Sequence, residues 1–138
     1  MAMNGSEREQ RIEQYARGAH RLHDALNLVA DGAVKWRPAA GKWSAHEIVC
    51  HCADSETNGA MRLRYLLAEN DPVIMAYDQD AWARIFDYHS RPLEPALALV
   101  EAVRAATVPL LRALGEEAWS RAGRHSDSGS GRVSFKNA

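Results

Sequence analysis

The residues that could do chemistry gather on one stretch of the chain, residues 41–64 (GKWSAHEIVCHCADSETNGAMRLR). Four polar side chains recur there at the spacing i, i+4, i+7 and i+11, which places them along one side of a helix: His51, Ser55, Asn58 and Arg62. The row borders an apolar arc, so it is expected to face the space between helices. An imidazole in such a place is either a hydrogen-bonded interior histidine or a metal ligand. His51 is therefore a candidate site residue, and on spacing alone the hydrogen-bonded interior histidine is the simpler of the two explanations.

Two cysteines, Cys50 and Cys52, flank this histidine. On a helix they point about 200° apart, so they can neither form a disulfide nor share a metal ion. A redox function would favour a C-x-x-C motif, which the sequence lacks. We therefore expect both to be small buried or half-buried thiols.

The other candidate groups form no recognisable set. His20 and His23 make an H-x-x-H pair that could chelate a metal, but no further ligands accompany it, and core packing or hydrogen bonding is the favoured explanation. His89 is expected at the surface rather than as a ligand. Ser44 and Ser55 have no sequence neighbours that would activate a nucleophile. The sequence alone assigns no catalytic residue.

A helix must position His51. Ser44 and Glu47 form a capping box, in which each side chain accepts a hydrogen bond from the other residue's backbone N–H. The helix is predicted to begin at Ser44, and nothing breaks its period before Asn-Asp-Pro at 70–72. Its predicted apolar arc consists of Ile48, Val49, Cys52, Gly59, Leu63, Leu66 and Leu67.

Two further long helices are predicted around it. The first begins near Ser6, which pairs with Glu9 in a second capping box, and it ends near Ala30. The third begins near Leu93 and ends at Leu114. These helices supply the remaining walls of any site at His51.

Two charged residues lie within the stripes that these helices should bury. Glu56 falls inside the apolar arc of the second helix, and Arg104 falls inside that of the third. Opposite charges on buried stripes are most simply explained by an ion pair, because an unpaired buried charge is costly. Asp54 is the alternative partner for Arg104.

The link between the second and third helices, residues 71–92, is 22 residues long. Usual helix–helix links have about 2–8 residues. A link of this length can travel the length of the bundle, so that the helices on either side of it run parallel. The sequence therefore predicts an all-α bundle with one crossover, and a short helix within residues 76–86.

The C-terminal part is harder to interpret. Residues 116–132 are polar and rich in Gly and Ser, and we expect an irregular segment, with a strand pair as the alternative. Ser134 could cap the start of another helix, of which only four residues follow. Because three apolar stripes are buried best by a fourth partner, we expect residues 1–138 to be a single domain whose fourth helix is truncated or supplied by a partner chain, with a homodimer as the expected assembly.

Composition narrows the class of protein. With 46% hydrophobic and 25% charged residues, the chain is typical of globular proteins. A net charge of −1 gives no basic surface for nucleic acid or anionic lipid. The sequence shows neither a signal peptide nor a membrane-spanning run, so we expect a cytoplasmic protein with no nucleic-acid or membrane partner.

The order of these motifs resembles a known family. The motifs are Trp43-Ser44, Glu47-Ile48, His51-Cys52-Ala53-Asp54, Glu56 and Arg62, followed by residues 91–95 and 102–114. The chain is similar to the DinB-like superfamily of bacterial four-helix bundles, which includes metal-dependent thiol transferases of the bacillithiol and mycothiol type. The resemblance implies an up-down-down-up bundle in which His51 is one of three metal ligands. It places the other two in an H-x-x-x-H pair on the fourth helix, which residues 1–138 do not contain.

The resemblance also implies an activity. It suggests that a divalent ion, nickel or zinc, assists the reaction of a low-molecular-weight thiol with a small electrophile. The alternative is a non-enzymatic helical module that dimerises or binds a small ligand and has lost the metal site. Because a single imidazole cannot hold a catalytic ion, residues 1–138 alone are expected to bind nickel or zinc weakly.

Overall fold

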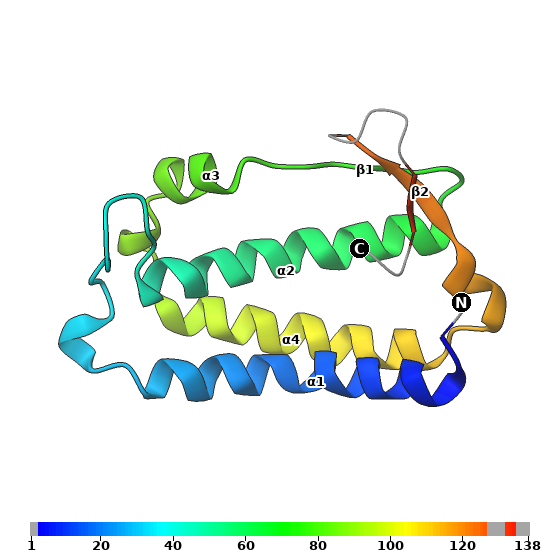
Figure 1. Cartoon of the computed structure of the whole chain (residues 1–138), viewed down its shortest axis with the longest axis horizontal. Coiled ribbons are helices and arrows are strands. Elements are labelled where there is room, and N and C mark those ends of the chain that lie inside the picture. The colour runs from blue at the N-terminus through cyan, green and yellow to red at the C-terminus, as the bar shows by residue number, and fades with distance from the viewer. Residues whose placement is uncertain (1–2, 127–131, 135–138) are drawn as a thin grey trace.

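The computed structural model describes residues 3–126 and 132–134, and three long helices form its body: α1 (Gly5–Asn27), α2 (Ala45–Ala68) and α4 (Leu93–Arg112). Helices α2 and α4 run parallel to each other and antiparallel to α1 (Figure 1). Residues 69–92 connect the end of α2 to the start of α4 by running back along the length of the bundle, and they include the short helix α3 (Gln79–Ile85). The predicted helical bundle and its crossover are confirmed.

Helix boundaries follow local capping chemistry. The Ser44–Glu47 capping box is present, with Ser44 Oγ accepting from the Glu47 N–H at 3.2 Å and a Glu47 carboxylate oxygen accepting from the Ser44 N–H at 3.0 Å. The predicted box at the start of α1 is wrong, because Asn4 and Glu7 form it instead. Asn is as good a cap as Ser, so the earlier pair starts the helix two residues before the predicted position.

A small sheet is added to the expected all-α body. Strand β2 (Ala122–His125) pairs in parallel with β1 (Val73–Ile74) and antiparallel with β3 (Arg132–Ser134). The expectation of an irregular segment is therefore wrong in β2, where the alternative of a strand pair is correct. The partner strand β1 has two residues and lies about 50 positions away, so sequence period could not reveal it. The expected helix after Ser134 lies outside the described residues.

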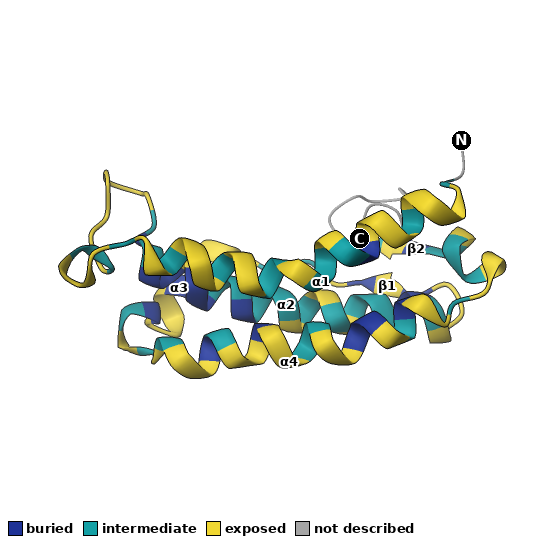
Figure 2. Cartoon of the chain, turned by 90° about the horizontal axis from the view of Figure 1, so that it is seen from below, coloured by how far each residue is buried: buried dark blue, intermediate teal, exposed yellow. Residues whose placement is uncertain are grey.

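The helices meet in two apolar clusters, and α4 packs against both α1 and α2. Buried residues lie on the facing sides of the helices, and exposed residues cover their outer sides (Figure 2). The cluster near the sheet contains Ile12, Leu66, Ile74, Val108 and Leu111, and the cluster near α3 contains Val49, Ala53, Ala96 and Val100.

The predicted apolar arc of α2 is only partly correct. Ile48 is 45% exposed and Gly59 is also exposed. Cys50 is buried instead, where it packs against Ala83 and Tyr88 of the crossover. The crossover covers a second side of α2, which a calculation on the isolated helix cannot anticipate.

Arg121 caps the C-terminal end of α2. This helix has no basic residue in its last turn. The Arg121 guanidinium, which follows α4 in sequence, donates hydrogen bonds to the backbone carbonyls of Leu66 and Glu69. These carbonyls have no partner inside the helix, so the guanidinium satisfies them and complements the negative end of the helix dipole.

Within the part of the chain that the structure describes, no helix combines the length and the hydrophobicity needed to cross a lipid bilayer.

Candidate functional site

A cavity of about 440 Å³ opens between α1, α2 and α4 near the middle of α2. His51 lines it, so the predicted polar row does face a space between helices. Nine residues form the walls: Gly18, Arg21 and Leu22 from α1, His51, Cys52, Ser55 and Glu56 from α2, and Val100 and Arg104 from α4. We call it the His51 cavity.

The imidazole of His51 is held without hydrogen bonds. Its Nδ1 atom is fully enclosed and has no partner among the described residues. The ring of Trp43 packs against it, with the two ring centroids 4.7 Å apart. Burial lowers the pKa of His51, against the opposing effects of Asp54 and Asp80. The ring is therefore neutral at pH 7 and keeps the lone pair that a metal ligand needs.

The polar row divides into two parts. Asn58 donates to the backbone carbonyl of Asp54 at 2.9 Å, and the Arg62 guanidinium donates to the carbonyl of Met75 in the crossover. These two side chains therefore hold the backbone. Only His51 and Ser55 line the cavity.

The predicted ion pair forms one side of the His51 cavity. Arg104 Nη2 donates to a Glu56 carboxylate oxygen at 2.9 Å, and Arg104 Nη1 donates to the backbone carbonyl of Tyr15 at 2.8 Å. The Tyr15 hydroxyl donates to the other Glu56 oxygen at 2.7 Å. Burial, followed by this hydrogen bond, raises the pKa of Tyr15 to about 12. The side chains of Glu56 and Arg104 are 10% and 23% exposed, so the prediction of a buried pair is confirmed.

Gly18 makes room for this guanidinium. A Cβ atom at position 18 would overlap Arg104 Nη1. The guanidinium cannot move away freely, because Glu56 and the carbonyl of Tyr15 hold it. The absence of a side chain on α1 is thus a condition for the ion pair between α2 and α4.

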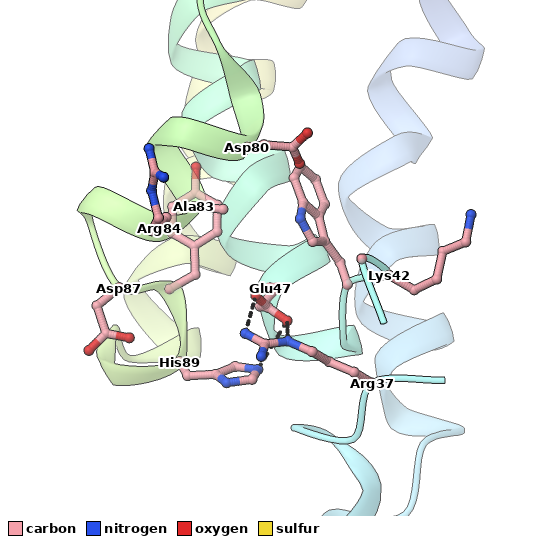
Figure 3. Close-up of a pocket in the computed structure, with 11 residues that line it drawn as sticks. Arg37, Lys42, Glu47, Asp80, Ala83, Arg84, Asp87 and His89 are labelled. Carbon is pink, nitrogen blue, oxygen red and sulfur yellow. Dashed lines mark hydrogen bonds and ion pairs between the residues drawn. The ribbon is translucent and has the colours of Figure 1, made fainter. Parts of the chain in front are cut away.

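A second polar group lies at the N-terminal end of α2, beside a cavity of about 520 Å³ (Figure 3). Arg37 contacts both carboxylate oxygens of Glu47, at 2.7 and 2.9 Å, and His89 Nε2 lies 3.2 Å from the same carboxylate. Hydrogen bonding from Arg37 lowers the pKa of Glu47 to about 2 despite its burial. Ser44, Glu47, Arg37 and His89 are called the Glu47 cluster below.

The Glu47 cluster contains a serine beside a histidine, with Ser44 Oγ 2.7 Å from His89 Nε2. In a catalytic triad the carboxylate orients the histidine through its other nitrogen. Here the same Nε2 atom approaches both Ser44 and Glu47. Ser44 is also 1% exposed and caps the helix. The arrangement stabilises the start of α2 and offers no nucleophile.

The position of His89 differs from the predicted one. The sequence placed it at the surface, whereas its side chain is only 26% exposed and belongs to the Glu47 cluster. Its partner Ser44 lies 45 positions earlier. No local pattern could have revealed the contact.

The remaining candidates take structural positions. Cys50 is buried and Cys52 lines the His51 cavity, and burial raises the pKa of both thiols, as expected for inert cysteines. His20 lies 3.4 Å from Asp24, and His23 hydrogen-bonds Asn27 at 3.1 Å. Both histidines are exposed, and they line a different cavity from that of His51.

Asp54 is not the partner of Arg104. It accepts a hydrogen bond from the Tyr88 hydroxyl at 2.6 Å and pairs with Arg91 at 3.1 Å. Asp54 thereby ties α2 to the segment that leads into α4.

The described residues do not complete a metal centre. Among them, no three His, Cys, Asp or Glu side chains are grouped so that they could hold an ion. His51 offers one imidazole, and the carboxylate of Glu56 in the same cavity is used by Arg104 and Tyr15. A catalytic zinc site uses three protein ligands. The described residues by themselves therefore do not fit a catalytic metal ion.

The chain belongs to the DinB superfamily, whose family model matches residues 14–138. It is 37% identical over 91 residues to "Putative metal-dependent hydrolase OB0782" of Oceanobacillus iheyensis, covering 66% of this chain and 52% of that protein. It is 30% identical over 127 residues to "Putative metal-dependent hydrolase OB0413" of the same organism, covering 92% of this chain and 71% of that protein. The chain thus spans about half the length of the first relative.

A solved structure confirms the fold. It is described as "YfiT from Bacillus subtilis is a probable metal-dependent hydrolase with an unusual four-helix bundle topology". The match has a TM-score of 0.89 at 24% identity and covers 99% of this chain and 77% of that one. At this level of identity the likeness establishes the architecture.

Proposed function

We propose that this chain forms part of a metal-dependent enzyme whose centre lies in the His51 cavity. The observation that carries the proposal is the neutral imidazole of His51, which lines a cavity and has no hydrogen-bond partner among the described residues. A histidine that only supports the fold would have a partner for its enclosed nitrogen. The names of the related proteins, metal-dependent hydrolases, support the same assignment.

The proposed reaction joins a low-molecular-weight thiol to a small electrophile. A divalent ion, nickel or zinc, would lower the pKa of a thiol or water molecule bound to it. The volume of the cavity, about 440 Å³, suits a small molecule. Hydrolysis, which the names of the relatives indicate, would use the same cavity with water in place of the thiol.

The other ligands must come from outside the described residues. The family resemblance suggests an H-x-x-x-H pair on a further helix. A further helix that packs over the His51 cavity, which α1, α2 and α4 line, would bring these ligands to His51. We expect residues 1–138 to contribute His51 to a site that this helix completes.

Calorimetric titration with nickel and zinc tests the proposal. Residues 1–138 should bind either ion weakly, whereas a version extended by a helix carrying H-x-x-x-H should bind one equivalent. His51→Ala should abolish that binding, and the control His20→Ala should leave it unchanged, because His20 lies outside the cavity. Tight one-to-one binding that survives His51→Ala would place the site elsewhere.

A second candidate is a helical interaction module without metal. Large apolar side chains are exposed on α2 and α4, namely Ile48, Met61, Tyr65 and Leu99, at 45%, 49%, 47% and 37%. Such side chains favour a partner helix or a second copy of the chain. Failure of the extended version to bind metal, together with a dimer in light scattering, would favour this candidate over the enzyme.

A further inference from the structure

Three polar side chains at the His51 cavity lack protein partners. Within residues 3–126, Arg21, His51 and Ser55 make no hydrogen bond or ion pair with another side chain or with the backbone. They come from two helices, α1 and α2. Convergent polar groups that the protein leaves unsatisfied are the usual sign of a ligand site.

The other charged residues of the cavity satisfy each other. Glu56 and Arg104 pair at 2.9 Å, so their charges cancel within the wall. Arg21 is then the cation among the lining residues that no carboxylate pairs with. Its guanidinium is therefore available to an anionic ligand.

The rest of the wall is apolar. Leu22, Val100 and Cys52 line the same space. A ligand that fits must combine an apolar body with a single anionic group. A dianion such as phosphate would fit poorly, because among the lining residues Arg21 is the one cation that no carboxylate already pairs with.

We propose that the His51 cavity binds the carboxylate of a small organic molecule through Arg21 and Ser55. A guanidinium presents paired N–H groups that match the two oxygens of a carboxylate. The Ser55 hydroxyl donates a further hydrogen bond, and the body of the molecule lies against Leu22 and Val100. The identification of this molecule as a substrate rests on the function proposed above; its binding does not.

The test uses two probes that differ only in charge, N-acetylcysteine and N-acetylcysteine amide. Each is titrated into residues 1–138 in the presence of a chelator, and binding is followed by NMR chemical shifts. Because no metal takes part, the result is independent of the metal titration. The acid should bind about tenfold more tightly than the amide, which corresponds to about 1.4 kcal/mol.

Two substitutions and one control locate the contact. Arg21→Gln should remove the preference for the acid, and Ser55→Ala should weaken binding of the acid several-fold. Arg11→Gln removes the same charge from the same helix at a site outside the cavity, so it should leave the preference unchanged. Arg21 and Arg11 are both exposed, so both variants should fold.

Three results would overturn the proposal. Equal binding of acid and amide would exclude a carboxylate site. An equal effect of Arg11→Gln and Arg21→Gln would show general electrostatic attraction. Competition by inorganic phosphate at the same concentration as the acid would show an anion site without preference for carboxylates.

Discussion

The Glu47 cluster and the His51 cavity lie about one turn apart on the same helix, and they treat polar groups in opposite ways. In the cluster, Glu47 bonds to Arg37 and to the Ser44 N–H, and His89 contacts both Ser44 and Glu47. In the cavity, the His51 ring and the Ser55 hydroxyl have no partner among the described residues. Both regions hold a close ion pair, Arg37–Glu47 and Arg104–Glu56, but of the two regions the cavity is the one that also has polar groups without a partner among the described residues.

The difference teaches where to look for a ligand. A fully satisfied buried network rigidifies the fold, whereas an unsatisfied buried group costs free energy unless a ligand or solvent pairs with it. Substitutions in satisfied networks should reduce the free energy of unfolding. Substitutions of unsatisfied groups should affect binding and leave stability nearly unchanged. Three stability predictions separate the two cases.

The largest effect is expected at the ion pair beside the cavity. Glu56→Gln and Arg104→Met should each lower the free energy of unfolding by about 3–5 kcal/mol, because each leaves a buried charge unpaired. The double variant should lose less than the sum of the two. Urea denaturation of the four proteins measures this coupling.

A surface pair provides the control. Glu13→Gln breaks contacts to Arg17 and Arg112, all exposed or half-buried, and should cost less than about 1 kcal/mol. Strict additivity at Glu56 and Arg104 would show that the two groups do not depend on each other.

An intermediate effect is expected in the Glu47 cluster. Glu47→Gln should cost about 1–3 kcal/mol at pH 7, because Arg37 loses its charged acceptor. The folded pKa of Glu47, about 2, lies below its ordinary value of 4.5, so the carboxylate stabilises the fold above pH 4.5. That stabilisation is lost as the pH falls from 4.5 toward 2.

Unfolding measured from pH 5 to pH 2 should therefore show a steeper loss in the wild type than in Glu47→Gln. Identical slopes would mean that another carboxylate dominates the acid response.

The smallest effect compares two serines of one region. Ser55→Ala should change the free energy of unfolding by less than about 0.5 kcal/mol, because its hydroxyl has no hydrogen-bond partner among the described residues and Ala is the better helix former. Ser44→Ala should cost about 1 kcal/mol through loss of the cap. If Ser55→Ala proved as costly as Ser44→Ala, the distinction between the two regions would fail. Thermal or urea unfolding of the wild type and the two variants measures these changes in the free energy of unfolding.

Local chemistry made much of the molecule predictable. The Ser44 cap, the placement of His51 beside a cavity and the Glu56–Arg104 pair all follow from helical period and charge. Each depends on residues within a few turns, or on one simple rule about buried charge. The parallel course of α2 and α4 followed from the length of one link.

The contacts that the sequence did not reveal join distant segments. His89 reaches Ser44 from the crossover, and β1 pairs with β2 about 50 positions later. A two-residue strand has no period, and a lone histidine has no motif, so neither carries a local signal. Arg21 was missed because an exposed arginine on a helix is ordinary until its neighbours across the groove are known.

Gly18 has a consequence for how this sequence can vary. Because a Cβ atom there would overlap the Arg104 guanidinium, a larger residue at position 18 requires a shorter one at 104. Glu56 would then lose its cation and become costly in turn. Positions 18, 56 and 104, one on each long helix, should therefore covary among homologues as a three-way set. Homologues that have a larger residue at position 18 and still have Glu at 56 and Arg at 104 would contradict this expectation. In them the guanidinium would have to take another path between the helices.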